Sequence, residues 1–188
     1  MKIVVVVGNP KRDSRTLRVA HSLGRLIAEN CDHGQDPVVI DLAEHARSMF
    51  EWPSAEMAAL NETVASSDVA IIASPTYKAS YTGLLKSFLD RYPAMGLADV
   101  NAVPVMTGAA KAHAMAPEVT LRPLLLELGA TMPTRGLYFE TPQFGRMDEV
   151  LSDWIGANTL GLLQLKAAAE ARDLARSPGG RPTTEGGS

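Results

Sequence analysis

The stretch IVVVVGNPKRDSRTL, running from Ile3 to Leu17, decides the fold of this chain. It opens with an isoleucine and four consecutive valines, which favour a strand because β-branched side chains are stiff and suit a pleated sheet. No polar residue interrupts the run, as is typical of a parallel strand buried on both faces. Apolar residues then recur at helical spacing as far as Ile27. The sequence therefore predicts a strand, a tight loop and a helix from about Arg15 to Glu29.

The loop between this strand and this helix carries groups that suit an anion. Gly8 and Pro10 turn the chain sharply, while Ser14 and Thr16 place hydroxyls where free N–H groups and the helix dipole favour negative charge. Positive charge comes from Lys11, Arg12 and Arg15. The loop matches neither the P-loop nor the G-x-G-x-x-G pattern, so a phosphomonoester fits better than the ligands of either motif. The alternative is a solvated basic turn with Ser14 as an ordinary N-cap.

Composition indicates one globular domain with no sign of a nucleic-acid or membrane partner. The 188 residues are 46% hydrophobic and 21% charged, and the net charge is -3. Cys31 is the only cysteine, which rules out an internal disulfide and fits a reducing compartment. Met1 and Lys2 lead straight into the strand, so we expect no signal peptide and a cytoplasmic protein. The four histidines show no ligand spacing, so we expect no metal site.

Strands and helices are predicted to alternate along the rest of the chain. Further strands are expected over residues 38–40, 69–73, 102–106 and 135–139, although Pro104 is unfavourable inside a strand. Helices are expected from Pro53 through Val64, over residues 84–92, in a kinked or two-part form over 113–128, and as one last helix over 148–173. Residues 44–52 are expected to form an irregular connection.

This alternation predicts an α/β domain, a flavodoxin-like three-layer sandwich with about five parallel strands in the order 2-1-3-4-5. The domain is expected to span residues 1–175. Residues 176–188 are rich in Gly, Pro, Ser and Thr and are expected to form a disordered tail.

Three loops are predicted to meet at the carboxyl ends of the strands, where such sheets bind their ligands. They cover residues 8–16, 74–81 and 107–113. The first carries the anion-binding groups, and the second carries Tyr77 and Tyr81 among small residues. The third is rich in Gly and Ala, so its backbone can approach a flat ligand closely. A phosphate site at one end, with an aromatic side chain and exposed backbone at the other, describes a site for FMN.

Three sequence blocks carry a family resemblance: GNPKRDSRT over residues 8–16, SPTYKASYTGLLK over residues 74–86, and Thr107-Gly108 followed by His113. They resemble the NAD(P)H-dependent FMN reductase family, above all the reductases that supply reduced flavin to two-component monooxygenases such as those of alkanesulfonate metabolism. The resemblance extends to about Phe139. Two positions depart from the family pattern. Asn9 stands where members often have serine, and Val119 stands where alkanesulfonate-type reductases can carry a tyrosine in a helical bulge.

The resemblance implies which residues bind FMN. The phosphate would be held by Ser14, Arg15 and Thr16, with Asn9, Pro10 and Lys11 beside it. The isoalloxazine ring would be wrapped by Pro75, Thr76, Tyr77 and Lys78. Its other edge would be lined by Thr107, Gly108, Ala109 and Ala110, and His113 matches a histidine common in the alkanesulfonate-type members. No catalytic side chain is expected, because the flavin carries the chemistry.

The implied activity is hydride transfer from NADPH or NADH to FMN, with flavin and nicotinamide as small-molecule partners and a monooxygenase as a protein partner. The family implies a homodimer or homotetramer. The sequence leaves open whether FMN is a bound group or a diffusing substrate. Two alternatives remain at this stage: an FMN-containing quinone or azo reductase, and a non-enzymatic flavodoxin-like electron carrier.

Overall fold

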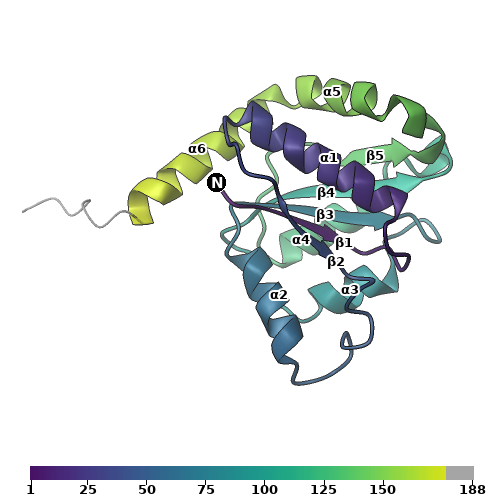
Figure 1. Ribbon diagram of the computed structural model, residues 1–188, viewed down its shortest axis with the longest axis vertical. Helices are drawn as coiled ribbons and strands as arrows, with labels where there is room; N and C mark the ends of the chain where they lie inside the picture. Colours follow the sequence, from purple (N-terminus) through teal and green to yellow (C-terminus); the bar gives the residue numbers. More distant parts are fainter. Residues whose placement is uncertain (177–188) are drawn as a thin grey trace, which may run out of the picture.

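The computed structural model describes residues 1–176, which form a five-stranded parallel sheet between two layers of helices (Figure 1). The strands are β1 (Ile3–Val7), β2 (Val38–Asp41), β3 (Val69–Pro75), β4 (Asn101–Gly108) and β5 (Leu137–Glu140). Their order is β2-β1-β3-β4-β5, and every neighbouring pair is parallel. The predicted flavodoxin-like fold and strand order are confirmed.

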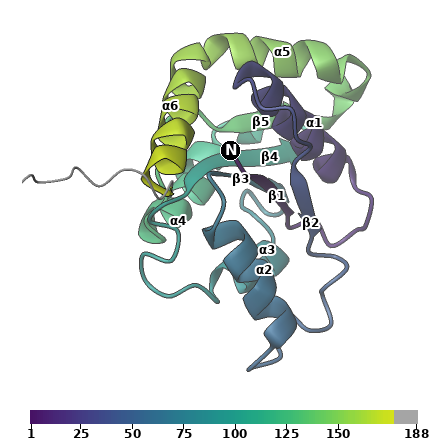
Figure 2. The ribbon, with the colours of Figure 1, turned by 60° about the vertical axis from the view of Figure 1, so that its left-hand side comes forward.

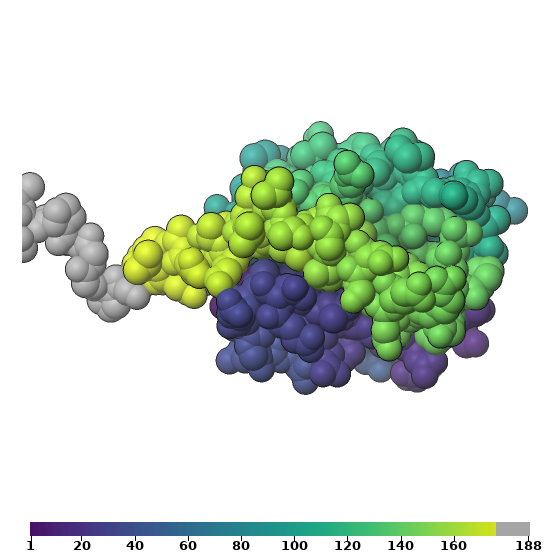
Figure 3. All heavy atoms as spheres, turned by 90° about the horizontal axis from the view of Figure 1, so that it is seen from above, coloured from purple at the N-terminus to yellow at the C-terminus, as the bar shows by residue number. Residues whose placement is uncertain are grey.

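Helices cover both faces of the sheet. The α-helices are α1 (Arg15–Asn30), α2 (Ala55–Ala65), α3 (Gly83–Leu89), α4 (Arg122–Glu127), α5 (Met147–Ala157) and α6 (Thr159–Arg176). Helices α1, α5 and α6 lie on one face, and α2, α3 and α4 lie on the other (Figure 2). Helices α5 and α6 run across their face beside α1 (Figure 3). No helix within residues 1–176 is long and apolar enough to cross a membrane.

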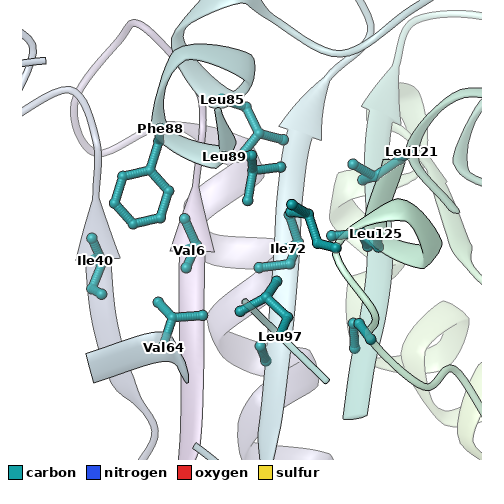
Figure 4. Close-up of a cluster of buried hydrophobic side chains, with 14 of the residues drawn as sticks. Val6, Ile40, Val64, Ile72, Leu85, Phe88, Leu89, Leu97, Leu121 and Leu125 are labelled. Carbon is teal, nitrogen blue, oxygen red and sulfur yellow. The ribbon is translucent and has the colours of Figure 1, made fainter. Parts of the chain in front are cut away.

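The valines of β1 supply the cores on both sides of the sheet. Val4 and Val6 belong to the core under α2, α3 and α4, whereas Val5 and Val7 belong to the core under α1, α5 and α6. Figure 4 shows Val6 in the first core, beside side chains from the neighbouring strands and from α3. All residues of β1 are buried, and each contributes roughly 1.5–3 kcal/mol. The unbroken apolar run therefore makes β1 a central strand.

The last helix differs from its prediction. One helix was expected over residues 148–173, but α5 ends at Ala157 and α6 begins at Thr159. Asn158 makes the break: its Nδ2 donates to the carbonyl of Trp154 at 2.8 Å, and its Oδ1 accepts from the N–H of Arg135 at 2.8 Å. The apolar pattern continues across this position, so no local pattern indicates the break.

Prolines account for smaller differences. Pro53 was expected in the first turn of a helix, but α2 begins at Ala55 because the Ser54 hydroxyl caps it, accepting from the N–H of Met57 at 3.4 Å. Pro104 lies inside β4, just before the ladder with β5 begins, so its missing N–H costs no bond to that strand. Pro75 ends β3 beyond the last residue paired with β1.

The segment between β4 and β5 confirms the expected two-part helix. A short 3₁₀ helix (Lys111–His113) is followed by a π-helix (Pro117–Leu121), which leads directly into α4. Val119 is exposed on the π-helix, so the helical bulge exists here without an aromatic side chain. Strand β5 begins and ends slightly later than the predicted residues 135–139. A further 3₁₀ segment (Thr141–Arg146) follows it. The tail expected over residues 176–188 lies, beyond Arg176, outside the described residues.

Candidate functional site

The three predicted loops meet at the carboxyl ends of β1, β3 and β4, where hydrogen bonds join them. The hydroxyl of Thr16 at the start of α1 lies 2.7 Å from the hydroxyl of Thr107 at the end of β4. The N–H of Thr76 donates to the Thr107 carbonyl at 2.7 Å, which ties the second loop to the third. The hydroxyl of Thr82 donates to the carbonyl of Gly8, which ties the second loop to the first. The loops therefore form one surface.

The side chains of the first loop are organised by Asn9. Its Oδ1 accepts from the N–H of Lys11 at 2.9 Å, and its Nδ2 donates to the Thr16 hydroxyl at 3.1 Å. Ser14 is buried and caps α1, accepting from the N–H of Leu17 at 3.1 Å. Three residues expected around a phosphate thus hold the loop together, and their hydroxyls keep further hydrogen-bonding capacity.

The main chain of the first loop leaves donors without acceptors. The N–H groups of Arg15 and Thr16 have no acceptor among the described residues, and they stand at the positive end of the α1 dipole. Lys11, Arg12 and Arg15 are exposed and form no ion pair within residues 1–176. Unpaired cations beside free N–H groups suit a doubly charged phosphate.

The second loop contains a strained turn. Tyr77 and Ser80 exchange backbone hydrogen bonds of 2.8 and 3.1 Å, with Lys78 and Ala79 between them at φ values of 52° and 65°. Left-handed backbone is unfavourable for both residue types, and such strain concentrates where proteins hold ligands. The turn presents Tyr77 with 53% of its surface exposed.

Two residues that sequence reasoning missed fix this second loop in place. Ser74 accepts from the N–H of Thr82 at 3.0 Å, and Thr82 caps α3 by accepting from the N–H of Leu85 at 3.2 Å. Helix α3 packs so closely that a Cβ added to Gly8 would lie 2.4 Å from the Cβ of Leu85. The Thr82-Gly83 pair just before an apolar helix was the available signal for the cap.

The third loop offers exposed backbone. Ala109 and Ala110 are exposed, and their N–H groups have no acceptor among the described residues. Gly108 lies against Tyr138, whose hydroxyl donates to the Ala110 carbonyl at 2.8 Å. His113 is exposed in the 3₁₀ helix, and within the described chain its ring makes no hydrogen bond or ion pair. The structure therefore joins His113 to the other predicted residues only through its main chain, whose N–H donates to the Ala110 carbonyl at 3.4 Å.

The buried hydroxyl of Thr76 lies between the second and third loops. Thr76 Oγ1 interacts with the Tyr138 phenol, which lowers the pKa of that phenol, and it has no other hydrogen-bond partner among the described residues. Buried polar atoms in proteins nearly always have partners, supplied by protein, water or ligand. Together with the free N–H groups of Ala109 and Ala110, this hydroxyl fits a ligand with a polar, hydrogen-bonding edge.

Asp41, at the end of β2, was also missed. Burial raises the pKa of its carboxyl, while backbone N–H groups of Ala43 and Asp13 act in the opposite direction. Ala43 donates to Asp41 Oδ1 at 3.2 Å, and the contact with Asp13 links this carboxyl to the first loop. Asp41 thus supports the first loop from the edge of the sheet.

Within residues 1–176, the side chains on this surface are hydroxyls, amides, cations and a tyrosine, which are groups suited to binding a ligand. A parallel 2-1-3-4-5 sheet with free N–H groups and cations after β1, an exposed tyrosine after β3 and open backbone after β4 is typical of flavodoxin-like flavin-binding proteins. Residues 1–142 match the family described as NADPH-dependent FMN reductase. The chain belongs to this family of oxidoreductases, which use NAD(P)H and FMN.

Individual relatives of the chain have names that agree with this family. The chain is 32% identical over 151 residues to the NADH-dependent FMN reductase SfnF of Pseudomonas fluorescens, a match that covers 77% of this chain and 79% of that protein. It is 35% identical over 99 residues to an FMN reductase (NADPH) of Pseudomonas putida KT2440, covering 53% of this chain and 48% of that protein. The apo crystal structure of the NADH:FMN oxidoreductase EmoB has a TM-score of 0.72 at 29% identity, covering 97% of this chain and 92% of that chain.

Proposed function

We propose that the chain transfers hydride from NAD(P)H to FMN and binds the flavin across the three joined loops. One observation carries the proposal: the free N–H groups of Arg15 and Thr16 lie beside cations that have no ion pair in the described chain. A helix start with free N–H groups and nearby cations is suited to binding the phosphate ester of FMN. The buried Thr76 hydroxyl, whose one interaction among the described residues is with the Tyr138 phenol, supplies a further hydrogen-bonding group for the polar edge of the ring.

Each loop has its own task in this proposal. Arg15 and the first turn of α1 bind the phosphate, and Tyr77 covers part of the ring. Lys78 adds a positive charge beside it, and the N–H groups of Ala109 and Ala110 donate to its polar edge, which stabilises negative charge there. FMN, when bound, supplies the hydride acceptor. The protein therefore acts by binding, orientation and electrostatics.

The resemblance of the three sequence blocks to the FMN reductase family supports a proposal for the protein partner, the cellular location and the oligomeric state. In this proposal the reduced flavin passes to a partner monooxygenase in the cytoplasm, and the chain works as a homodimer or homotetramer. Light scattering of the purified protein measures its oligomeric state directly. A monomer at working concentration would contradict it.

The phosphate assignment is tested with Arg15→Ala. A charge-assisted hydrogen bond is worth about 1.5–3 kcal/mol, so the Kd for FMN should rise about 10- to 150-fold, with a smaller change for riboflavin. The matched control is Arg25→Ala, an exposed arginine of the same helix that faces Asp36 and Glu29 instead. Equal losses for FMN and riboflavin would show that Arg15 does not bind the phosphate. Oxidation of NADPH and NADH with and without added FMN tests the reaction itself.

A further inference from the structure

Tyr138 lies outside the three loops, in β5, yet it contacts two of them. Its hydroxyl donates to the Ala110 carbonyl at 2.8 Å, across 28 residues of sequence. Its ring lies so close to Gly108 that an added Cβ would be 2.0 Å from the phenol oxygen and 2.8 Å from Cζ. Its phenol also interacts with Thr76 in the second loop. Burial raises the pKa of the phenol, and the hydrogen bond with the Thr76 side chain acts in the opposite direction.

The segment from Gly108 to Ala110 has no polar side chain of its own to fix its backbone. Among the described residues, the Tyr138 hydroxyl makes the one side-chain hydrogen bond to this segment. The same Ala110 carbonyl also accepts the N–H of His113 at 3.4 Å, where the 3₁₀ helix begins. The conformation of the third loop therefore depends on a group supplied by β5.

We propose that Tyr138 is a positioning residue for flavin binding, because its phenol fixes the Ala110 carbonyl and so keeps the N–H groups of Ala109 and Ala110 available to the ring. This inference rests on the proposed function. Tyr138 need not touch the flavin, since it acts through the loop. Its effect should fall on the ring end of the ligand, which FMN and riboflavin share, and not on the phosphate end, which only FMN has.

The test compares Tyr138→Phe with Tyr92→Phe. Tyr92 also donates its hydroxyl to a backbone carbonyl, that of Asn61 at 3.0 Å, but it lies in the segment after α3. Both variants lose one tyrosine-to-carbonyl hydrogen bond and keep the ring. Measurements are the Kd for FMN and for riboflavin, the melting temperature, and amide hydrogen exchange over residues 107–113 without flavin.

Tyr138→Phe should raise the Kd for FMN and for riboflavin by the same factor, about three- to tenfold, the worth of one neutral hydrogen bond. It should also speed exchange of the His113 amide in the protein without flavin, because this N–H donates to the Ala110 carbonyl that the phenol fixes. Tyr92→Phe should lower the melting temperature without either change. Unchanged flavin binding in Tyr138→Phe, or a loss confined to FMN, would overturn the inference. A wild-type protein that binds neither flavin would overturn the proposed function, before any Tyr138 variant is made.

Discussion

The hydroxyls of Thr16 and Thr107 lie 2.7 Å apart and connect the start of α1 to the end of β4. Both residues are buried. Asn9 adds a donor at one end of this link: its Oδ1 accepts from the N–H of Lys11, its Nδ2 donates to the Thr16 hydroxyl, and either threonine can be the donor in the bond between them. Only one of the two hydroxyl hydrogens is used in the bond between the threonines, so the pair keeps one further O–H donor.

Replacing either threonine by valine should destabilise the protein. Thr16→Val leaves the Thr107 hydroxyl and the Asn9 amide without their bonds to Thr16, and Thr107→Val leaves the Thr16 hydroxyl with its Asn9 bond alone, so each should cost about 1–3 kcal/mol of unfolding free energy. The double variant should cost less than the sum of the two, because the unpaired hydroxyl is then gone. Urea unfolding of the four proteins gives the coupling, expected at roughly 0.5–3 kcal/mol. Strictly additive losses would show that the two hydroxyls do not stabilise each other.

Gly8→Ala should be costly because α3 leaves no room for a side chain. The new Cβ would lie 2.4 Å from the Cβ of Leu85 and 3.1 Å from its Cα, so either the first loop or α3 must move. Overpacking of this kind costs about 1–3 kcal/mol in urea unfolding. Gly83→Ala is the control, since a Cβ there meets nothing within 4 Å. Its effect should stay within about 1 kcal/mol, and a similar loss in both variants would contradict the close packing of α3 on Gly8.

The sheet was predictable because its signals are local. The apolar run of β1, the apolar segments at later strands and the helices between them fix a parallel sheet, and right-handed crossovers then limit the strand order. The anion character of the first loop was predictable for the same reason, since Lys11, Arg12, Ser14 and Arg15 are neighbours in the sequence.

The features that were missed depend on contacts between distant segments. Asn158 ends α5 because it also bonds Arg135, and no local pattern shows that bond. In the sequence, Tyr138 is indistinguishable from the other apolar residues of a strand, and only the structure shows the hydrogen bond from its hydroxyl to the Ala110 carbonyl. In the sequence, Asp41 is only the polar end of a short strand, and the structure is needed to show its contact with the first loop. Such roles require the tertiary structure.

Asn158→Ala should destabilise the junction of α5 and α6. Asn158 is buried, and the change removes its bond to the Trp154 carbonyl and leaves the N–H of Arg135 without its acceptor. The expected cost is about 1–3 kcal/mol of unfolding free energy. The control is Asn30→Ala, whose exposed side chain makes the same kind of bond, to the Leu26 carbonyl at 2.8 Å. A surface change of this kind should stay within about 0.5 kcal/mol, and equal losses would contradict a special role for Asn158.

Asp41→Asn should change how stability depends on pH. Burial raises the pKa of the Asp41 carboxyl in the folded protein above its value in the unfolded chain, so the folded state holds this proton more tightly. Stability from this group is therefore present at low pH and falls as pH rises from the ordinary aspartate range to the raised folded pKa. An amide cannot ionise, although its oxygen still accepts from the N–H of Ala43. Urea unfolding at several pH values should show the wild type losing stability relative to Asp41→Asn across that window. A constant difference between the two proteins, or a wild type that gains on the variant as pH rises, would show that burial does not dominate this carboxyl.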